Sequence, residues 1–151
     1  MANQVDILIA EDNPADLRLM EEALRNLHPA PATHVVLDGE QMLRYLSEEQ
    51  APSPALLFLD FHLPKIESRD LLKHIREQHR FRDTAVVVLT TSEADELIFE
   101  AYRLGADCYL SKPSDLDDFL HTIRSAAEYW LNLRAHQLSG RVSAVCYDSG
   151  A

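Results

Sequence analysis

Residues 55–60 read Ala-Leu-Leu-Phe-Leu-Asp, an unbroken apolar run that ends in a carboxylate. Residues 85–90, Ala-Val-Val-Val-Leu-Thr, repeat the pattern and end in a hydroxyl. Neither run alternates between apolar and polar residues, which is typical of a strand that is covered on both faces. Such strands occur in parallel sheets between two layers of helices, so the two runs predict the interior of an α/β fold.

Three further segments, at 5–10, 33–37 and 107–111, are also predicted strands. Helical signals separate the strands, and the clearest is Asn13-Pro14, an N-cap followed by proline at the first helical position. Five β-α units joined by right-handed crossovers predict a doubly wound, five-stranded parallel sheet with helices on both faces. The predicted helices cover 14–27, 39–49, 68–79, 92–104 and a last segment that opens at Asp115 and continues past Trp130.

The composition fits one globular domain in a chain of 151 residues with 46% hydrophobic residues. The longest apolar runs are far shorter than the roughly 20 residues of a membrane helix. The N-terminus, Met-Ala-Asn-Gln-Val-Asp, lacks the basic segment with which a secretory signal begins, which argues against such a signal. We therefore expect a cytoplasmic protein without membrane contact. A net charge of −11 disfavours binding to nucleic acids. Cys108 and Cys146 have no metal or redox spacing.

Polar side chains stand at the ends of the predicted strands. Glu11 and Asp12 follow the first strand, Asp60 ends the third, Thr90 ends the fourth and Lys112 follows the fifth. Because ligands of doubly wound folds bind beyond the carboxyl ends of the strands, we expect these groups to share one edge. Three carboxylates in one cleft require a cation, and oxygen ligands favour Mg²⁺.

A carboxylate beside Mg²⁺ can attack phosphorus and form an aspartyl phosphate, whose oxygens Lys112 and Thr90 are placed to hold. Each residue also has an ordinary interpretation. The acidic pair can be a solvated or capping pair, Thr90 a strand residue and Lys112 a surface lysine. The placement of all of them at four strand ends of one fold favours a site.

Four motifs occur in order along the chain: Ile-Ala-Glu-Asp-Asn at 9–13, Leu-Asp-x-x-Leu-Pro at 59–64, Val-Val-Leu-Thr-Thr-Ser at 87–92 and Tyr-Leu-Ser-Lys-Pro at 109–113. Together they resemble the receiver domain of two-component response regulators over residues 5–130. The resemblance implies a flavodoxin-like receiver fold with strand order 2-1-3-4-5. It also implies a receiver domain over 1–134 with an extended last helix, and a tail over 135–151 without an output domain.

The resemblance assigns roles to the residues at the strand ends. Asp60 is the implied phosphoacceptor, Thr90 contacts the phosphoryl group, Lys112 pairs with it and Tyr109 is the aromatic switch residue. The bond between Lys112 and Pro113 is expected to be cis. The implied Mg²⁺ ligands are Asp60, Asp12, the backbone carbonyl of His62 and, through water, Glu11.

Finer features resemble single-domain regulators that serve bacterial phytochrome-type histidine kinases. These are Glu-Asp-Asn-Pro-Ala-Asp at 11–16, Leu-Thr-Thr-Ser at 89–92 and Lys-Pro-x-Asp-Leu-Asp-x-Phe at 112–119. The implied partner is such a kinase, and the implied function is phosphoryl acceptance in a light-sensing two-component pathway. The protein would be a signalling regulator that catalyses its own phosphotransfer with Mg²⁺ and dephosphorylates itself.

Two features concern the loop after the third strand, and the first departs from the family pattern. Many family members have glycine eight residues after the phosphoacceptor, where this chain has Ser68. Since glycine tolerates positive φ, Ser68 suggests an altered or strained loop. The side chain of His62, two residues after Asp60, is placed to influence the access of water to the phosphate.

Two rival functions belong to other classes. A Mg²⁺-dependent phosphohydrolase with an aspartate nucleophile needs a second carboxylate as general acid, commonly two residues on, where this chain has His62. A flavodoxin-like cofactor protein needs a phosphate-cradling loop after the first strand, where Glu11-Asp12-Asn13-Pro14 would repel a phosphate. Both rivals are therefore weaker than the receiver.

The last helix carries a broad apolar stripe. A helix over 115–134 is longer than the predicted strands, so Trp130, Leu131 and Leu133 are expected to project beyond the sheet. We expect a homodimer through this helix, with a fold-back of the residues after Arg134 as the alternative. The stripe comprises Leu116, Phe119, Leu120, Ile123, Ala127, Trp130 and Leu131.

Overall fold

The structure, a computed structural model, describes residues 4–91 and 94–138 and contains one parallel sheet. Its strand order, β2-β1-β3-β4-β5, confirms the predicted doubly wound topology. Each strand lies within one residue of its predicted bounds. The strands are β1 (Asp6–Ala10), β2 (Ala32–Val36), β3 (Leu56–Asp60), β4 (Ala85–Thr90) and β5 (Cys108–Ser111).

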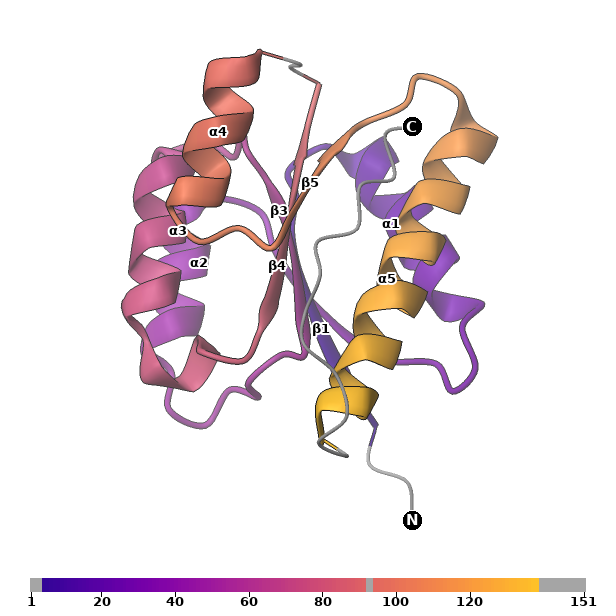
Figure 1. Ribbon diagram of the computed structural model, residues 1–151, viewed down its shortest axis with the longest axis horizontal. Coiled ribbons are helices and arrows are strands. Elements are labelled where there is room, and N and C mark those ends of the chain that lie inside the picture. Colours follow the sequence, from indigo (N-terminus) through magenta and orange to yellow (C-terminus); the bar gives the residue numbers. More distant parts are fainter. Residues whose placement is uncertain (1–3, 92–93, 139–151) are drawn as a thin grey trace.

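Two helices cover one face of the sheet and three cover the other (Figure 1). The apolar cores on the two faces explain the unbroken apolar runs, because Phe58 packs toward α1 and α5 while Leu57 and Leu59 pack toward the other three helices. None of the helices in the described ranges is long and apolar enough to cross a membrane. The helices are α1 (Pro14–Arg25), α2 (Gly39–Ser47), α3 (Ser68–Glu77), α4 (Asp95–Arg103) and α5 (Leu116–Leu138), with a 3₁₀ turn, η1 (His79–Phe81).

The N-terminal ends of α1 and α4 differ in how well the sequence predicted them. Asn13 caps α1 as expected, because its side chain accepts hydrogen bonds from the backbone N–H groups of Ala15 and Asp16. Helix α4 begins at Asp95, after Ala94 in an extended conformation, and Ala94 provides no side-chain cap. The predicted cap, Ser92, lies outside the described residues, and the helix starts later than predicted.

Helix α5 corrects the expectation that Trp130 and Leu133 project beyond the core. Trp130 is 6% exposed and Leu133 9% exposed, and both belong to the core between the sheet and α1. Trp130 lines a small cavity together with Ala55 and Thr84, which precede β3 and β4, so the loops before these strands face the helix there. Of the predicted stripe, Leu116 is the most exposed, at 63%. The helix also continues to Leu138, beyond the boundary expected at residue 134.

Candidate functional site

Three carboxylates meet at the carboxyl ends of β1 and β3. Carboxylate oxygens of Glu11, Asp12 and Asp60 all lie within 4.8 Å of one another. They meet because β1 pairs in parallel with β3, with Ala10 opposite Leu59, so the residues that follow lie side by side. Glu11 and Asp60 are buried and Asp12 is exposed. Oxygen donors of this kind, with one open side, fit a divalent cation that keeps water ligands.

Burial raises the pKa of Glu11 to about 7, since an ionised carboxylate loses its hydration in the interior. Lys112 lowers this pKa through a hydrogen bond, and the nearby Asp60 raises it further. The backbone N–H of Asn13 donates to Glu11 Oε1 at 3.1 Å. The charge of Glu11 therefore depends on the neighbouring Lys112 and Asp60.

Lys112 lies among the carboxylates, and its side chain is 9% exposed. Its Nζ donates to Glu11 Oε2 at 2.7 Å, to Asp16 Oδ2 at 3.1 Å and to Asp60 Oδ2 at 3.3 Å. Burial alone would lower the pKa of Lys112, but Glu11 and Asp60, with help from Asp16, outweigh it and raise the pKa above its usual value. An ammonium with three anionic partners stays charged and neutralises part of the repulsion between them.

Asp16 is a member of the site that the sequence analysis missed. It stands in the first turn of α1, which begins at the edge of the sheet where the other carboxylates lie. The signal that would have found it is the capped helix start at Asn13-Pro14, because the first turn of that helix must face the strand ends.

The contact between Thr90 and His62 is a second feature of the site, after Asp16, that the sequence did not predict. Thr90 is fully buried at the end of β4, and its Oγ1 lies 3.1 Å from Nε2 of the exposed His62. The backbone N–H of His62 donates to Asp60 Oδ1 at 2.9 Å. Asp60 thus has a donor on each carboxylate oxygen, His62 on one and Lys112 on the other.

Tyr109 and Pro113 lie on the fifth strand and just after it. Tyr109 is buried, at 8% exposed, and its backbone N–H donates to Tyr102 Oη at 3.2 Å. The cis bond expected before Pro113 is not found, since the cis peptide of the described residues is His28–Pro29. The trans form is the ordinary preference of a bond before proline, and at Lys112 the backbone N–H continues the ladder by donating to Thr90 O at 2.8 Å.

Ser68 does not strain the loop that follows Asp60. It is the first residue of α3, and its buried hydroxyl donates to the backbone carbonyl of Asp60 at 3.1 Å. The left-handed residue of this loop is instead Lys65, with φ of 79°. The positive φ of this loop thus lies three residues before Ser68, and Ser68 itself adds a hydrogen bond to the backbone of Asp60.

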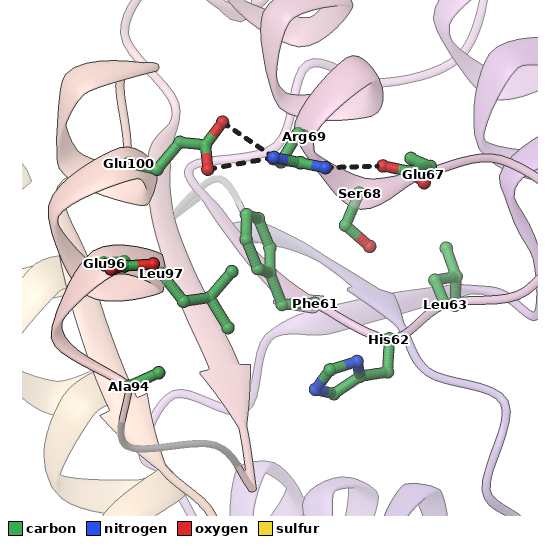
Figure 2. A pocket seen from close by; sticks show the side chains of 10 residues that line it. All are labelled: Phe61, His62, Leu63, Glu67, Ser68, Arg69, Ala94, Glu96, Leu97 and Glu100. Carbon is green, nitrogen blue, oxygen red and sulfur yellow. Dashed lines mark hydrogen bonds and ion pairs between the residues drawn. The ribbon is translucent and has the colours of Figure 1, made fainter.

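A cavity of about 600 Å³ adjoins the site between the loop after β3 and the start of α4 (Figure 2). Leu97 of α4 points toward Phe61 across it, and His62 lies at its edge, so His62 borders both the cavity and Thr90. Along the rim, Arg69 donates to both carboxylate oxygens of Glu100, each at 3.1 Å. This ion pair joins α3 to α4 beside the site.

Comparisons with known proteins point to one protein family. The family model described as response regulator receiver domain matches residues 7–124. Response regulator Rcp1 of Synechocystis sp. is 33% identical over 129 residues, which cover 83% of this chain and 88% of that protein. The crystal structure of the phosphorylated cyanobacterial phytochrome response regulator RcpA is 34% identical, with a TM-score of 0.82, and covers 87% of this chain and 96% of its own.

A third comparison bears on the metal. The crystal structure of the Mn²⁺-bound form of response regulator Rcp1 is 32% identical, with a TM-score of 0.79, and covers 84% of this chain and 94% of its own. Receiver domains bind a divalent metal in an acidic pocket, and here that pocket is formed by Glu11, Asp12 and Asp60.

Proposed function

This chain belongs to the family of response regulator receiver domains, and from that premise we propose that Asp60 accepts the phosphoryl group from a phosphohistidine of a sensor kinase. The observation that carries the proposal is the position of Asp60. Its carboxylate ends a buried strand, lies 3.3 Å from the ammonium of Lys112 and shares an acidic pocket with Glu11 and Asp12. A carboxylate in this position is fixed at the edge of the sheet, where it can act as a nucleophile.

In this phosphoryl transfer, Asp60 is the nucleophile and Lys112 stabilises the product. One carboxylate oxygen of Asp60 attacks phosphorus, and the bond from phosphorus to the imidazole nitrogen breaks. The imidazole leaves with the electron pair and takes up a proton from solvent. The Lys112 ammonium, which in the structure contacts Asp60, moves to the new phosphoryl oxygens.

The proposed metal is Mg²⁺, which neutralises negative charge on the carboxylates and on the incoming phosphoryl oxygens when it is bound. We assign the ligands as Asp12, Asp60 and the backbone carbonyl of His62, with Glu11 acting through water. The hard oxygen donors of the pocket and the Mn²⁺-bound form of Rcp1 support this assignment.

Thr90 and Tyr109 carry the signal to the surface in this proposal. Thr90 leaves the His62 imidazole, 3.1 Å away, and bonds to the phosphoryl group, and Tyr109 repacks into the space that Thr90 vacates. The population then shifts toward a second arrangement of α4, β5 and the start of α5. Hydrolysis by water ends the signal, and His62 borders the path to Asp60.

We further infer that the kinase is of the phytochrome type. Support comes from the likeness to RcpA, which is described as a cyanobacterial phytochrome response regulator, and to Rcp1. The proposal includes a cytoplasmic location, because the kinase domain must reach Asp60 by diffusion.

The test of this pathway is phosphotransfer from a panel of purified, phosphorylated histidine kinases of phytochrome and other classes. We expect the phytochrome-type kinases to lose label to this chain at least tenfold faster than the others, and we expect no transfer to Asp60→Asn. Equal rates across the classes would contradict the phytochrome assignment but leave Asp60 as the acceptor.

We also propose a homodimer, on a revised surface. With Trp130 and Leu133 buried, the supporting residues are Leu116 at the start of α5 and, on α4, Phe99 at 71% exposed and Tyr102 at 39% exposed. Exposed apolar side chains on both sides of the edge strand β5 favour a partner. Light scattering should give a dimer for the wild type and a monomer for Phe99→Glu, and a wild type that stays monomeric at high micromolar concentration contradicts the dimer.

A further inference from the structure

The ammonium of Lys112 has three anionic partners, one for each of its N–H bonds. Two of them, Glu11 and Asp60, have side chains that are 1% and 7% exposed, whereas Asp16 is 26% exposed. Asp16 therefore holds the ammonium from the solvent side, and the other two hold it from the interior.

The three partners differ in what else they can bind. Glu11 and Asp60 belong to the group of carboxylates whose oxygens lie close enough together to share a metal ion, and Asp16 does not belong to it. A divalent cation in that pocket therefore competes with Lys112 for Glu11 and Asp60 and leaves Asp16 as the partner of the ammonium.

We propose that Asp16 is a positioning residue, which retains the Lys112 ammonium beside the site when Glu11 and Asp60 bind a divalent cation. Asp16 lowers the free-energy cost of binding the cation, because the ammonium that leaves Glu11 and Asp60 keeps a carboxylate partner instead of passing into water. It then releases the ammonium to an incoming phosphoryl group. This last step rests on the proposed function, whereas the effect on metal binding does not.

Helix α1 fixes Asp16 for this role. The backbone N–H of Asp16 donates to Asn13 Oδ1 at 3.0 Å, and the helix begins two residues earlier at Pro14. The N-terminus of a helix also favours a negative charge in its first turn. Asp16 is thus a charged group on a rigid support, unlike a flexible side chain that pairs with lysine by chance.

The experiment measures the dissociation constant of Mg²⁺ alone by titration calorimetry, with unphosphorylated protein, so that its outcome does not depend on Asp60 as the phosphoacceptor. The four proteins are the wild type, Asp16→Asn, Lys112→Gln and the double variant. Asp16→Asn should weaken Mg²⁺ binding about fivefold, because Lys112 then has only the metal's own ligands as anionic partners. The same change should have an effect of less than about twofold in the Lys112→Gln background.

Two further variants serve as controls. Asp16→Glu keeps the charge and should restore binding to within about twofold of the wild type. Asp70→Asn removes a carboxylate at the equivalent first-turn position of α3, where it is exposed, and should change nothing. An equal loss in both Lys112 backgrounds would show that Asp16 acts only through its charge, and an unchanged constant for Asp16→Asn would show no role. Either result overturns the proposal.

Discussion

The pKa of Glu11 is raised to about 7, and we therefore expect the free energy of unfolding to depend on pH. Its pKa in the unfolded chain is 4.5, so between these values the folded protein binds a proton that the unfolded chain has released. The contribution of Glu11 to folding is therefore fully present below about pH 4.5 and is lost as pH rises through about 7. The full difference corresponds to roughly 3 kcal/mol.

The measurement is urea unfolding of metal-free wild type and Glu11→Gln between pH 5 and pH 8. Glutamine cannot ionise, so the variant should gain stability relative to the wild type as pH rises, by about 2–3 kcal/mol across this range. A difference between the two proteins that stays constant with pH contradicts the raised pKa of Glu11. The comparison cancels the other titrating groups that the two proteins share.

Helix α5 is longer than the strands it packs against, and most of its apolar side chains are nevertheless covered. The helix has 23 residues and extends well past the ends of strands of four to six residues. It nevertheless buries Trp130, because the segments before β3 and β4 lie under its second half. Trp130→Ala should therefore lower the free energy of unfolding by about 3–5 kcal/mol.

Leu116 on the same helix is the matched control, since it is 63% exposed. Leu116→Ala should change the free energy of unfolding by less than about 0.5 kcal/mol under conditions in which the protein is monomeric. The check is denaturant unfolding of the two variants at low protein concentration. Similar small losses for both would mean that Trp130 is not a core residue.

The same helix shows where sequence reasoning reached its limit. The apolar runs at β3 and β4 predicted the sheet, because burial on both faces leaves no polar alternation. The helix does extend past the strands, but the expected exposure of Trp130 and Leu133 was wrong, because the loops before the strands were left out of the comparison. Side-chain partners such as Asp16 with Lys112, or His62 with Thr90, depend on the directions in which helix and loop project, which residue spacing does not give.

On the scale of the whole molecule, a strongly acidic chain gathers several of its carboxylates in one pocket. A cation that binds the folded pocket and not the unfolded chain adds stability, about 2.7 kcal/mol at a hundredfold excess over the dissociation constant. Magnesium at that level should raise the melting temperature by about 5–10 °C. Asp12→Asn removes the exposed carboxylate of the pocket and should abolish most of the rise.

The rise is measured by thermal unfolding with MgCl₂ against NaCl of equal ionic strength, which separates binding from general screening of the negative charge. An equal rise for the wild type and Asp12→Asn would mean that the metal acts elsewhere. The carboxylates at this edge were predictable from their positions after strands, since parallel strands bring their carboxyl ends together.

The most direct test of the account is the intact mass of the protein after incubation with acetyl phosphate or phosphoramidate and Mg²⁺. The wild type should gain one phosphoryl group, and it should gain none when the metal is chelated. Asp60→Asn keeps the shape of the side chain without its nucleophilic carboxylate, and it should gain none under either condition. Labelling of Asp60→Asn equal to that of the wild type would contradict the account, because the phosphoryl group would then be carried by another residue.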